Sequence, residues 1–172
     1  MIALITGGSG SGKSLYAEKL VEKLSGQNRV YLATMRVWDA ESERRVARHR
    51  VQRADRGFAT VECPLDLASV QLPEDATVLL EDVPNLVANE MFDAGGNTRR
   101  LLPALRELAL RCKNLVLVTN DVFAGGAAYD DSTLAYMRLL AQVNAELAGI
   151  ADYAAEIVFT IPVPFKGEKI CV

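Results

Sequence analysis

The chain has little cysteine, a single histidine and no long hydrophobic run. Its three cysteines, Cys63, Cys112 and Cys171, are widely spaced, and none lies in a Cys-x-x-Cys pair. This odd, scattered set argues against a disulfide framework or a zinc site and favours a reducing compartment. No apolar stretch approaches the ~20 residues that a membrane span requires. No basic leader with a cleavage site precedes the first predicted strand, so we expect a cytoplasmic protein without a membrane span.

The chain also lacks a strong excess of either charge. Its 172 residues include 19 Lys and Arg against 22 Asp and Glu, a net charge of -3, which argues against a nucleic-acid partner. Hydrophobic residues make up 50% and charged residues 24%, as in ordinary globular proteins. No internal repeat, linker or low-complexity segment interrupts the sequence. We therefore expect one nucleotide-binding domain over residues 1–172, and the next motif explains why a nucleotide is expected.

A glycine-rich motif stands directly behind the apolar run at 2–6. Its residues are Gly7, Gly8, Ser9, Gly10, Ser11, Gly12, Lys13 and Ser14. This order matches a phosphate-binding loop (P-loop) that joins a buried strand to a helix. Glycines let successive backbone N–H groups wrap around a β-phosphate. Lys13 is expected to neutralise β and γ oxygens and Ser14 to hold Mg²⁺, while the helix that follows points its positive end at the anion. The alternative, a Gly/Ser-rich turn that matches by accident, does not explain the flanking strand and helix patterns.

Short apolar runs alternate with helical periodicity along the rest of the chain. The predicted strands cover residues 2–6, 30–34, 77–81, 115–119 and 156–160. The predicted helices cover residues 13–24, 40–56, 83–91, 98–112 and 132–148. Continuously apolar strands indicate a parallel sheet covered by crossover helices. We therefore predict an α/β fold of the P-loop NTPase (RecA-like) kind: a three-layer sandwich whose mostly parallel sheet ends in a C-terminal hairpin. Pro162 and Pro164 suit this hairpin's edge strand, and Lys166-Gly167 suggest its turn.

The single histidine lies in an arginine-rich segment. Around His49 stand Arg44, Arg45, Arg48, Arg50, Arg53 and Arg56. At helical spacing Arg45, His49 and Arg53 share one stripe, where like charges favour the neutral, nucleophilic imidazole. Because arginine binds phosphate in a bidentate manner, His49 would be placed to attack an α-phosphorus and carry a nucleotide covalently. The alternative is a solvated charged helix in which His49 is incidental.

Acidic and polar residues follow two later strands. Glu81 and Asp82 end the strand at 77–81, where a P-loop protein keeps the carboxylate that holds Mg²⁺ or its water. A plain solvated strand end would give the same pattern. Asn120 and Asp121 precede a glycine-containing loop at 124–127. That loop would either shape an acceptor pocket at the carboxyl edge of the sheet or be an ordinary loop.

Several of these motifs occur together in one enzyme family. The P-loop, residues 31–34, Arg45-Val46 with His49 and Arg53, residues 79–81, residues 118–120 and Val143-Asn144 stand in its order and spacing. Over nearly its whole length the chain resembles the bifunctional adenosylcobinamide kinase/adenosylcobinamide-phosphate guanylyltransferases of cobalamin biosynthesis. It differs from their pattern at Gly10, where the family usually has arginine, and within 120–123 and 137–145.

The resemblance implies a site and a set of partners. It makes His49 the residue that carries GMP covalently, beside the catalytic Lys13 of the P-loop. The implied GTP contacts are the P-loop, Ala33, Thr34, Met35, Arg50, Val51, Gln52, Arg53, Glu62 and Glu81, and the Mg²⁺ candidates are Ser14, Glu81 and Asp82. ATP or GTP would donate phosphate to adenosylcobinamide, and a homotrimer is expected. The residues leave two alternatives open: a small-molecule kinase without guanylyl transfer, and a GTP-binding regulatory module.

Overall fold

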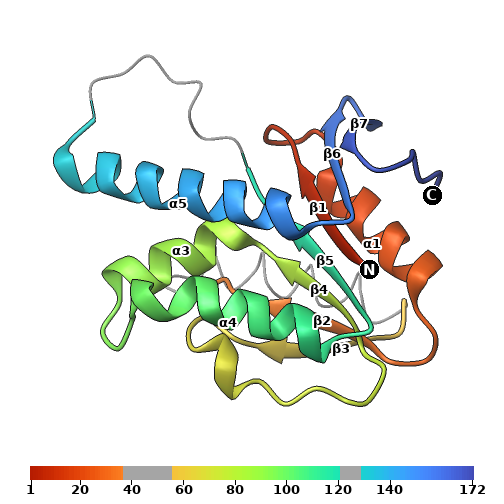
Figure 1. The fold of residues 1–172 in the computed structure, drawn as a ribbon, viewed down its shortest axis with the longest axis horizontal. Helices are drawn as coiled ribbons and strands as arrows, with labels where there is room; N and C mark the ends of the chain where they lie inside the picture. Colours follow the sequence, from red (N-terminus) through yellow and green to blue (C-terminus); the bar gives the residue numbers. More distant parts are fainter. Residues whose placement is uncertain (37–55, 121–128) are drawn as a thin grey trace.

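The computed structural model describes residues 1–36, 56–120 and 129–172, and Figure 1 shows their arrangement. Its first elements are β1 (Ile2–Thr6), α1 (Lys13–Leu24), β2 (Arg29–Ala33), β3 (Phe58–Glu62), the short 3-10 turn η1 (Leu67–Ser69) and β4 (Thr77–Glu81). They are followed by α3 (Val83–Phe92), α4 (Thr98–Arg111), β5 (Asn114–Val118), α5 (Asp131–Ile150), β6 (Tyr153–Val158) and β7 (Ile161–Lys166). The helix predicted over 40–56 lies outside the described residues except for Arg56.

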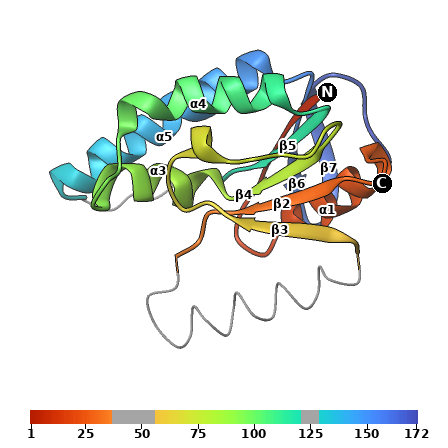
Figure 2. The same ribbon diagram turned by 90° about the horizontal axis from the view of Figure 1, so that it is seen from below.

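Seven strands form one sheet in the order β3-β2-β4-β5-β1-β6-β7. Every pairing is parallel except that of β6 with β7. Helix α1 covers one face, and α3, α4 and α5 cover the other (Figures 1 and 2). Each face has its own apolar core, which includes Tyr16 and Leu20 of α1 on one side and Leu86, Leu105 and Leu140 on the other. The predicted three-layer α/β sandwich is therefore confirmed.

Burial explains which strands the sequence pattern could find. In β4 the side chains of Val78, Leu79 and Leu80 are fully buried, because helices cover both faces of this central strand. Each such side chain contributes roughly 1.5–3 kcal/mol on leaving water. Strand β3 was not predicted, and it lies at the edge of the sheet with β2 as its strand neighbour and mostly exposed or half-buried residues. An edge strand of this kind needs no apolar run, so it leaves no such signal.

The C-terminal hairpin exists, but its predicted turn and strand limits are wrong. Strand β6 begins at Tyr153 and ends at Val158, so residues 156–160 include the turn. That turn is made by Phe159 and Thr160, whose φ angles of 47° and 67° are left-handed, and not by Lys166-Gly167. Since neither residue is a glycine or asparagine, the sequence carries no ordinary turn signal at this position. The prolines Pro162 and Pro164 do lie in an edge strand, as expected.

The parallel strands bring one set of loops to a common edge. The carboxyl ends of β2, β4, β5 and β1 lie side by side in register, so the P-loop after β1 stands beside the residues that follow these neighbours. In open α/β sheets this is the edge where ligands bind. Within 1–36, 56–120 and 129–172, no helix is both long enough and apolar enough to cross a membrane.

Candidate nucleotide-binding site

The P-loop connects β1 to α1 through glycines that no other residue can replace without strain. Gly7 has a φ of 150°, and a Cβ there would lie 2.6 Å from the Ile157 carbonyl oxygen and 2.7 Å from Ser11 Oγ. Gly12 caps α1 in a left-handed conformation with a φ of 93°, and a Cβ there would lie 2.9 Å from Thr160 Cγ2. The loop is therefore packed against β6 and the turn behind it, and this packing holds its backbone in place.

The first turn of α1 is open to an anion. Among the described residues no side chain caps its N-terminus, and no acidic residue occupies its first turn. Ser11 Oγ is buried there without a hydrogen-bond partner in the described part of the chain. Unpaired backbone N–H groups and the positive end of a helix dipole bind phosphate. These features fit the triphosphate that the motif predicts. Lys13 lies across the same loop, with Nζ donating to the Gly8 carbonyl at 3.2 Å.

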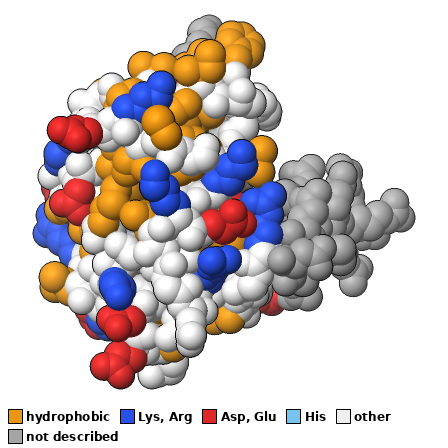
Figure 3. Space-filling view, turned by 90° about the vertical axis from the view of Figure 1, so that its right-hand side faces the viewer, with side chains coloured by type: hydrophobic (Ala, Val, Ile, Leu, Met, Phe, Trp, Pro, Cys, Tyr) orange, Lys and Arg blue, Asp and Glu red, His pale blue; other side chains and the backbone are white. Residues whose placement is uncertain are grey.

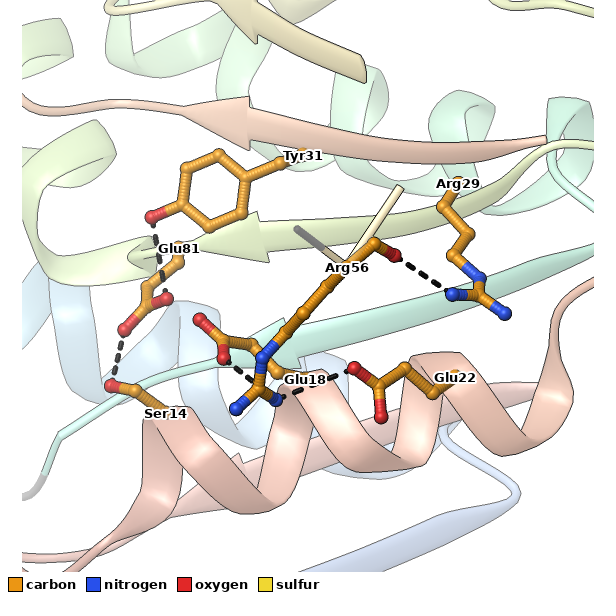
Figure 4. Close-up of polar contacts among 7 residues, drawn as sticks. All are labelled: Ser14, Glu18, Glu22, Arg29, Tyr31, Arg56 and Glu81. Carbon is orange, nitrogen blue, oxygen red and sulfur yellow. Dashed lines mark hydrogen bonds and ion pairs between the residues drawn. The ribbon is translucent and has the colours of Figure 1, made fainter. Parts of the chain in front are cut away.

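Ser14 and Glu81 meet at the mouth of the loop, as Figure 4 shows. Ser14 Oγ donates to Glu81 Oε1, although the two residues are 67 positions apart. Tyr31 OH donates to Glu81 Oε2 at 3.3 Å, so both carboxylate oxygens are held. A hydroxyl beside one carboxylate fits Mg²⁺, which is commonly held by one or two carboxylates plus phosphate and water oxygens. In the described ranges no cluster of three His, Cys, Asp or Glu residues offers a fully protein-made metal site.

Asp82 is oriented differently from Glu81. Its Oδ1 accepts a hydrogen bond from Asn85 N at 2.7 Å and caps α3. Its backbone N–H donates to Thr34 Oγ1 at 2.9 Å, and Thr34 Oγ1 donates to the Asp82 carbonyl at 2.9 Å. Burial raises the pKa of Asp82 to about 6, and neighbouring Glu81 raises it as well, against the opposing effects of the Asn85 N–H and Lys13. Of the two predicted acidic ligands, Glu81 is the one that contacts Ser14.

Three further predicted residues lie along the edge formed by β3, β2 and β4. Ala33 is paired in register with Glu62 on one side and Glu81 on the other. Two strand spacings put the Cα atoms of Glu62 and Glu81 about 10 Å apart. Thr34 is fully buried and its hydroxyl is used by Asp82, so it positions the edge from inside. Met35 follows, half-buried, within the described residues. Predicted contacts from distant parts of the sequence therefore share one edge with the P-loop.

Arg56 binds the helix that begins at the P-loop (Figure 4). Its Nη1 lies 3.2 Å from Glu18 Oε2 and 3.4 Å from Glu22 Oε1, and its carbonyl accepts a 2.8 Å hydrogen bond from Arg29 Nη1. Glu18 lies one turn after Ser14 on the same face of α1, about 6 Å along the axis. The predicted residues His49, Arg50, Val51, Gln52 and Arg53 lie outside the described residues.

Sequence reasoning missed two polar pairs around the site. Tyr31 was noticed in a motif but not as the partner of Glu81, a contact that depends on β2 and β4 being neighbours. Thr119 Oγ1 donates to Asn144 Oδ1 at 2.7 Å, which ties the end of β5 to α5. The only sequence signal for this pair was that both residues belong to motifs shared with one family.

The fold and the site define the class of this protein: it is a P-loop nucleotide-binding protein with a three-layer α/β sandwich. Its sequence matches the model of the cobinamide kinase / cobinamide phosphate guanyltransferase family over residues 3–165, and the chain belongs to that family. Members of the family are bifunctional enzymes, which makes this chain a transferase with kinase and nucleotidyltransferase character.

Individual relatives agree with this assignment. The chain is 30% identical over 184 residues to the bifunctional adenosylcobalamin biosynthesis protein CobU of Salmonella typhimurium, covering 96% of this chain and all of that protein. It is 32% identical over 186 residues to the Escherichia coli protein of the same name, with the same coverage.

Two solved structures share the fold at lower sequence identity. The flagellar accessory protein FlaH of Methanocaldococcus jannaschii superposes with a TM-score of 0.51 at 12% identity, over 96% of this chain and 78% of that one. The ATPase domain of a second protein superposes with a TM-score of 0.51 at 12% identity, over 90% of this chain and 68% of that one.

Proposed function

We propose that the protein phosphorylates adenosylcobinamide with ATP or GTP and then transfers GMP from GTP to adenosylcobinamide phosphate through His49. The observation that carries the proposal is the uncapped α1 N-terminus behind a glycine loop, with Ser14 bound to Glu81 beside it, in a chain of this family. In the first reaction the aminopropanol hydroxyl attacks the γ-phosphorus, and the nucleoside diphosphate leaves. Lys13 and the loop N–H groups stabilise the charge on the phosphate oxygens.

The second reaction needs a nucleophile that the P-loop does not contain. The His49 imidazole nitrogen would attack the α-phosphorus of GTP, forming a P–N bond as the bond to pyrophosphate breaks. A phosphate oxygen of adenosylcobinamide phosphate would then attack the same phosphorus and release His49, which gives adenosylcobinamide-GDP. Arg50 and Arg53 would hold the transferred phosphate. The segment that carries them rejoins the described chain at Arg56, which is bound to the P-loop helix, and this supports one shared site.

The bound groups have assigned holders in this proposal. Mg²⁺, held by Ser14 and Glu81, would offset negative charge on the phosphate oxygens. Glu81 is already held in position for this role by Tyr31. Ala33, Met35 and Glu62, along the neighbouring edge, are proposed to contact GTP during guanylyl transfer. Asp82 supports the site from the start of α3, and water near its carboxylate would complete the ion's shell.

A homotrimer is also part of the proposal, since the resemblance implies it. Figure 3 views the side of the molecule toward which the C-terminus lies and shows hydrophobic side chains among the charged ones. On β7 the alternate residues Ile161, Val163 and Phe165 are about half exposed or more. Such a face on an edge strand is a surface that association would cover.

The test is labelling with GTP that carries the isotope on its α-phosphorus. With Mg²⁺ present, the protein should acquire label that is stable in base and lost in acid, as a phosphoramidate is. His49→Asn should fold, bind GTP and still phosphorylate adenosylcobinamide, while the label and adenosylcobinamide-GDP both disappear. Label that never forms on the wild-type protein, with the kinase step intact, would leave a small-molecule kinase. GTP binding without turnover of any corrinoid would leave a regulatory module.

A further inference from the structure

A groove lies beside the P-loop on the side away from Glu81 and Glu62. Its volume is about 230 Å³, and its walls are residues 8–11 of the loop and residues 156–159 at the end of β6. Strand β1 stands between β5 and β6 in the sheet, so the β2–β4 edge and this groove flank the loop from opposite sides. A nucleotide whose phosphates are held by the loop would therefore meet the groove immediately next to them.

The far wall of the groove is fastened to the loop by its backbone. Thr160 N donates to the Ser11 carbonyl at 2.8 Å. Gly12 and Gly7 leave room only for hydrogen where Thr160 and Ile157 approach them. The turn after β6 is therefore held at a set distance from the phosphate loop, as a preorganised binding surface requires.

Phe159 stands at this wall in a conformation that packing inside the chain does not explain. It is 86% exposed, and its φ of 47° is left-handed, which is costly for an L-residue without compensation. In the described part of the chain the one aromatic contact joins Phe92 and Tyr136, so no ring packs on Phe159 there. An exposed aromatic ring next to a phosphate site provides a stacking surface for a nucleobase.

Glu156 adds a charge to the same groove. It is exposed at the end of β6, paired in register with Thr6, the residue that immediately precedes the P-loop. Within the described residues its carboxylate has no hydrogen bond or ion pair. A carboxylate only accepts hydrogen bonds. Guanine presents an N1–H and an N2 amino group side by side, whereas adenine presents an acceptor at N1, so this carboxylate favours guanine.

We propose that this groove is a nucleobase subsite for the triphosphate held by the P-loop, with Phe159 stacking on a purine and Glu156 favouring guanine. The inference rests on the proposed function and deepens it, because it makes GTP the preferred phosphate donor. It assigns base recognition to the β6–β7 turn, separately from the GTP contacts expected at Ala33, Glu62 and Glu81.

The experiment compares ligands with and without a base. Binding of Mg²⁺ complexes of α,β-methylene GTP, α,β-methylene ATP and inorganic triphosphate is measured by calorimetry without a corrinoid. The methylene bridge prevents transfer to His49. Phe159→Ala should weaken both nucleotides about fivefold or more and leave inorganic triphosphate unchanged. Glu156→Gln should weaken the GTP analogue about tenfold while the ATP analogue keeps its affinity.

Phe165→Ala is the matched control, because Phe165 is also exposed but lies on β7 outside the residues that line the groove. It should change none of the three affinities. Unchanged affinity of both nucleotides in Phe159→Ala would overturn the subsite, and equal losses of both in Glu156→Gln would overturn its preference for guanine. If wild-type protein binds neither the nucleotides nor inorganic triphosphate, the proposed function itself fails, which is a different outcome.

Discussion

Replacing Asp82 by asparagine should make the protein more stable at neutral pH than at acidic pH relative to wild type. Asp82 caps α3 through a 2.7 Å hydrogen bond from Asn85 N, and asparagine caps helices equally well. The substitution therefore keeps the cap and removes only the titrating proton. What changes is the cost of holding a carboxylate at a site where burial, more than any other factor, disfavours the charged form.

The expected size follows from the pKa. In the folded protein the pKa of Asp82 is raised from 3.8 to about 6. Between these values the native state binds a proton that the unfolded chain has lost, so stability falls as pH rises through this window. A shift of about 2 units corresponds to at most about 3 kcal/mol. Below the window the group contributes no pH dependence, and above it the cost is constant.

The assay is urea unfolding of nucleotide-free protein from about pH 4 to about pH 8 for wild type and variant. The stability of Asp82→Asn minus that of wild type should rise across this range by up to about 3 kcal/mol. Asp130→Asn is the control, because Asp130 caps α5 but its pKa is lowered to about 2, chiefly by the Ser132 hydroxyl. Its stability difference should stay flat above about pH 4. A flat difference for Asp82→Asn as well would refute the argument from burial.

Three further outcomes are expected. Lys13→Ala should lower both activities by roughly 10²–10³-fold, as the loss of one charge-stabilising group does, and near wild-type turnover at saturating nucleotide would remove Lys13 from catalysis. Gly7→Ala should cost about 1–3 kcal/mol of stability in thermal unfolding because its Cβ would meet the Ile157 carbonyl, whereas Gly8→Ala, with no atom within 4 Å of its Cβ, should be nearly neutral; equal losses would contradict the packing argument. Light scattering at micromolar concentration should give a trimer, and a monomer with intact guanylyl transfer would exclude the shared assembly.

Sequence alone was sufficient for the features that depend on neighbouring residues or on deep burial. The P-loop is contiguous, and its glycines have the positive φ angles that the motif requires at Gly7, Gly10 and Gly12. The central strands are apolar throughout because both of their faces are covered, so their runs could be recognised directly. The single domain and the roles of His49 and Arg50 to Arg53 stay predictions, since they depend on residues outside the described ranges or on experiments.

Other parts depended on which strands lie next to each other. Strand β3 and the turn at Phe159 and Thr160 were missed, because an exposed edge needs no apolar run and a left-handed turn without glycine carries no signal. The acid at the end of β4 was expected near the P-loop, but its contact with Ser14 and Tyr31 follows from the order of β2, β4, β5 and β1.

The groove beside the P-loop is the clearest product of tertiary structure. It exists because β6 pairs with β1, although most of the chain lies between these two strands. Local patterns arise from propensity and periodicity over a few residues, whereas strand order is decided by how the whole sheet buries its two faces. The sequence by itself therefore determined the phosphate site and the fold class. Only the tertiary structure decided which side chains surround that phosphate site, because their neighbours come from distant strands.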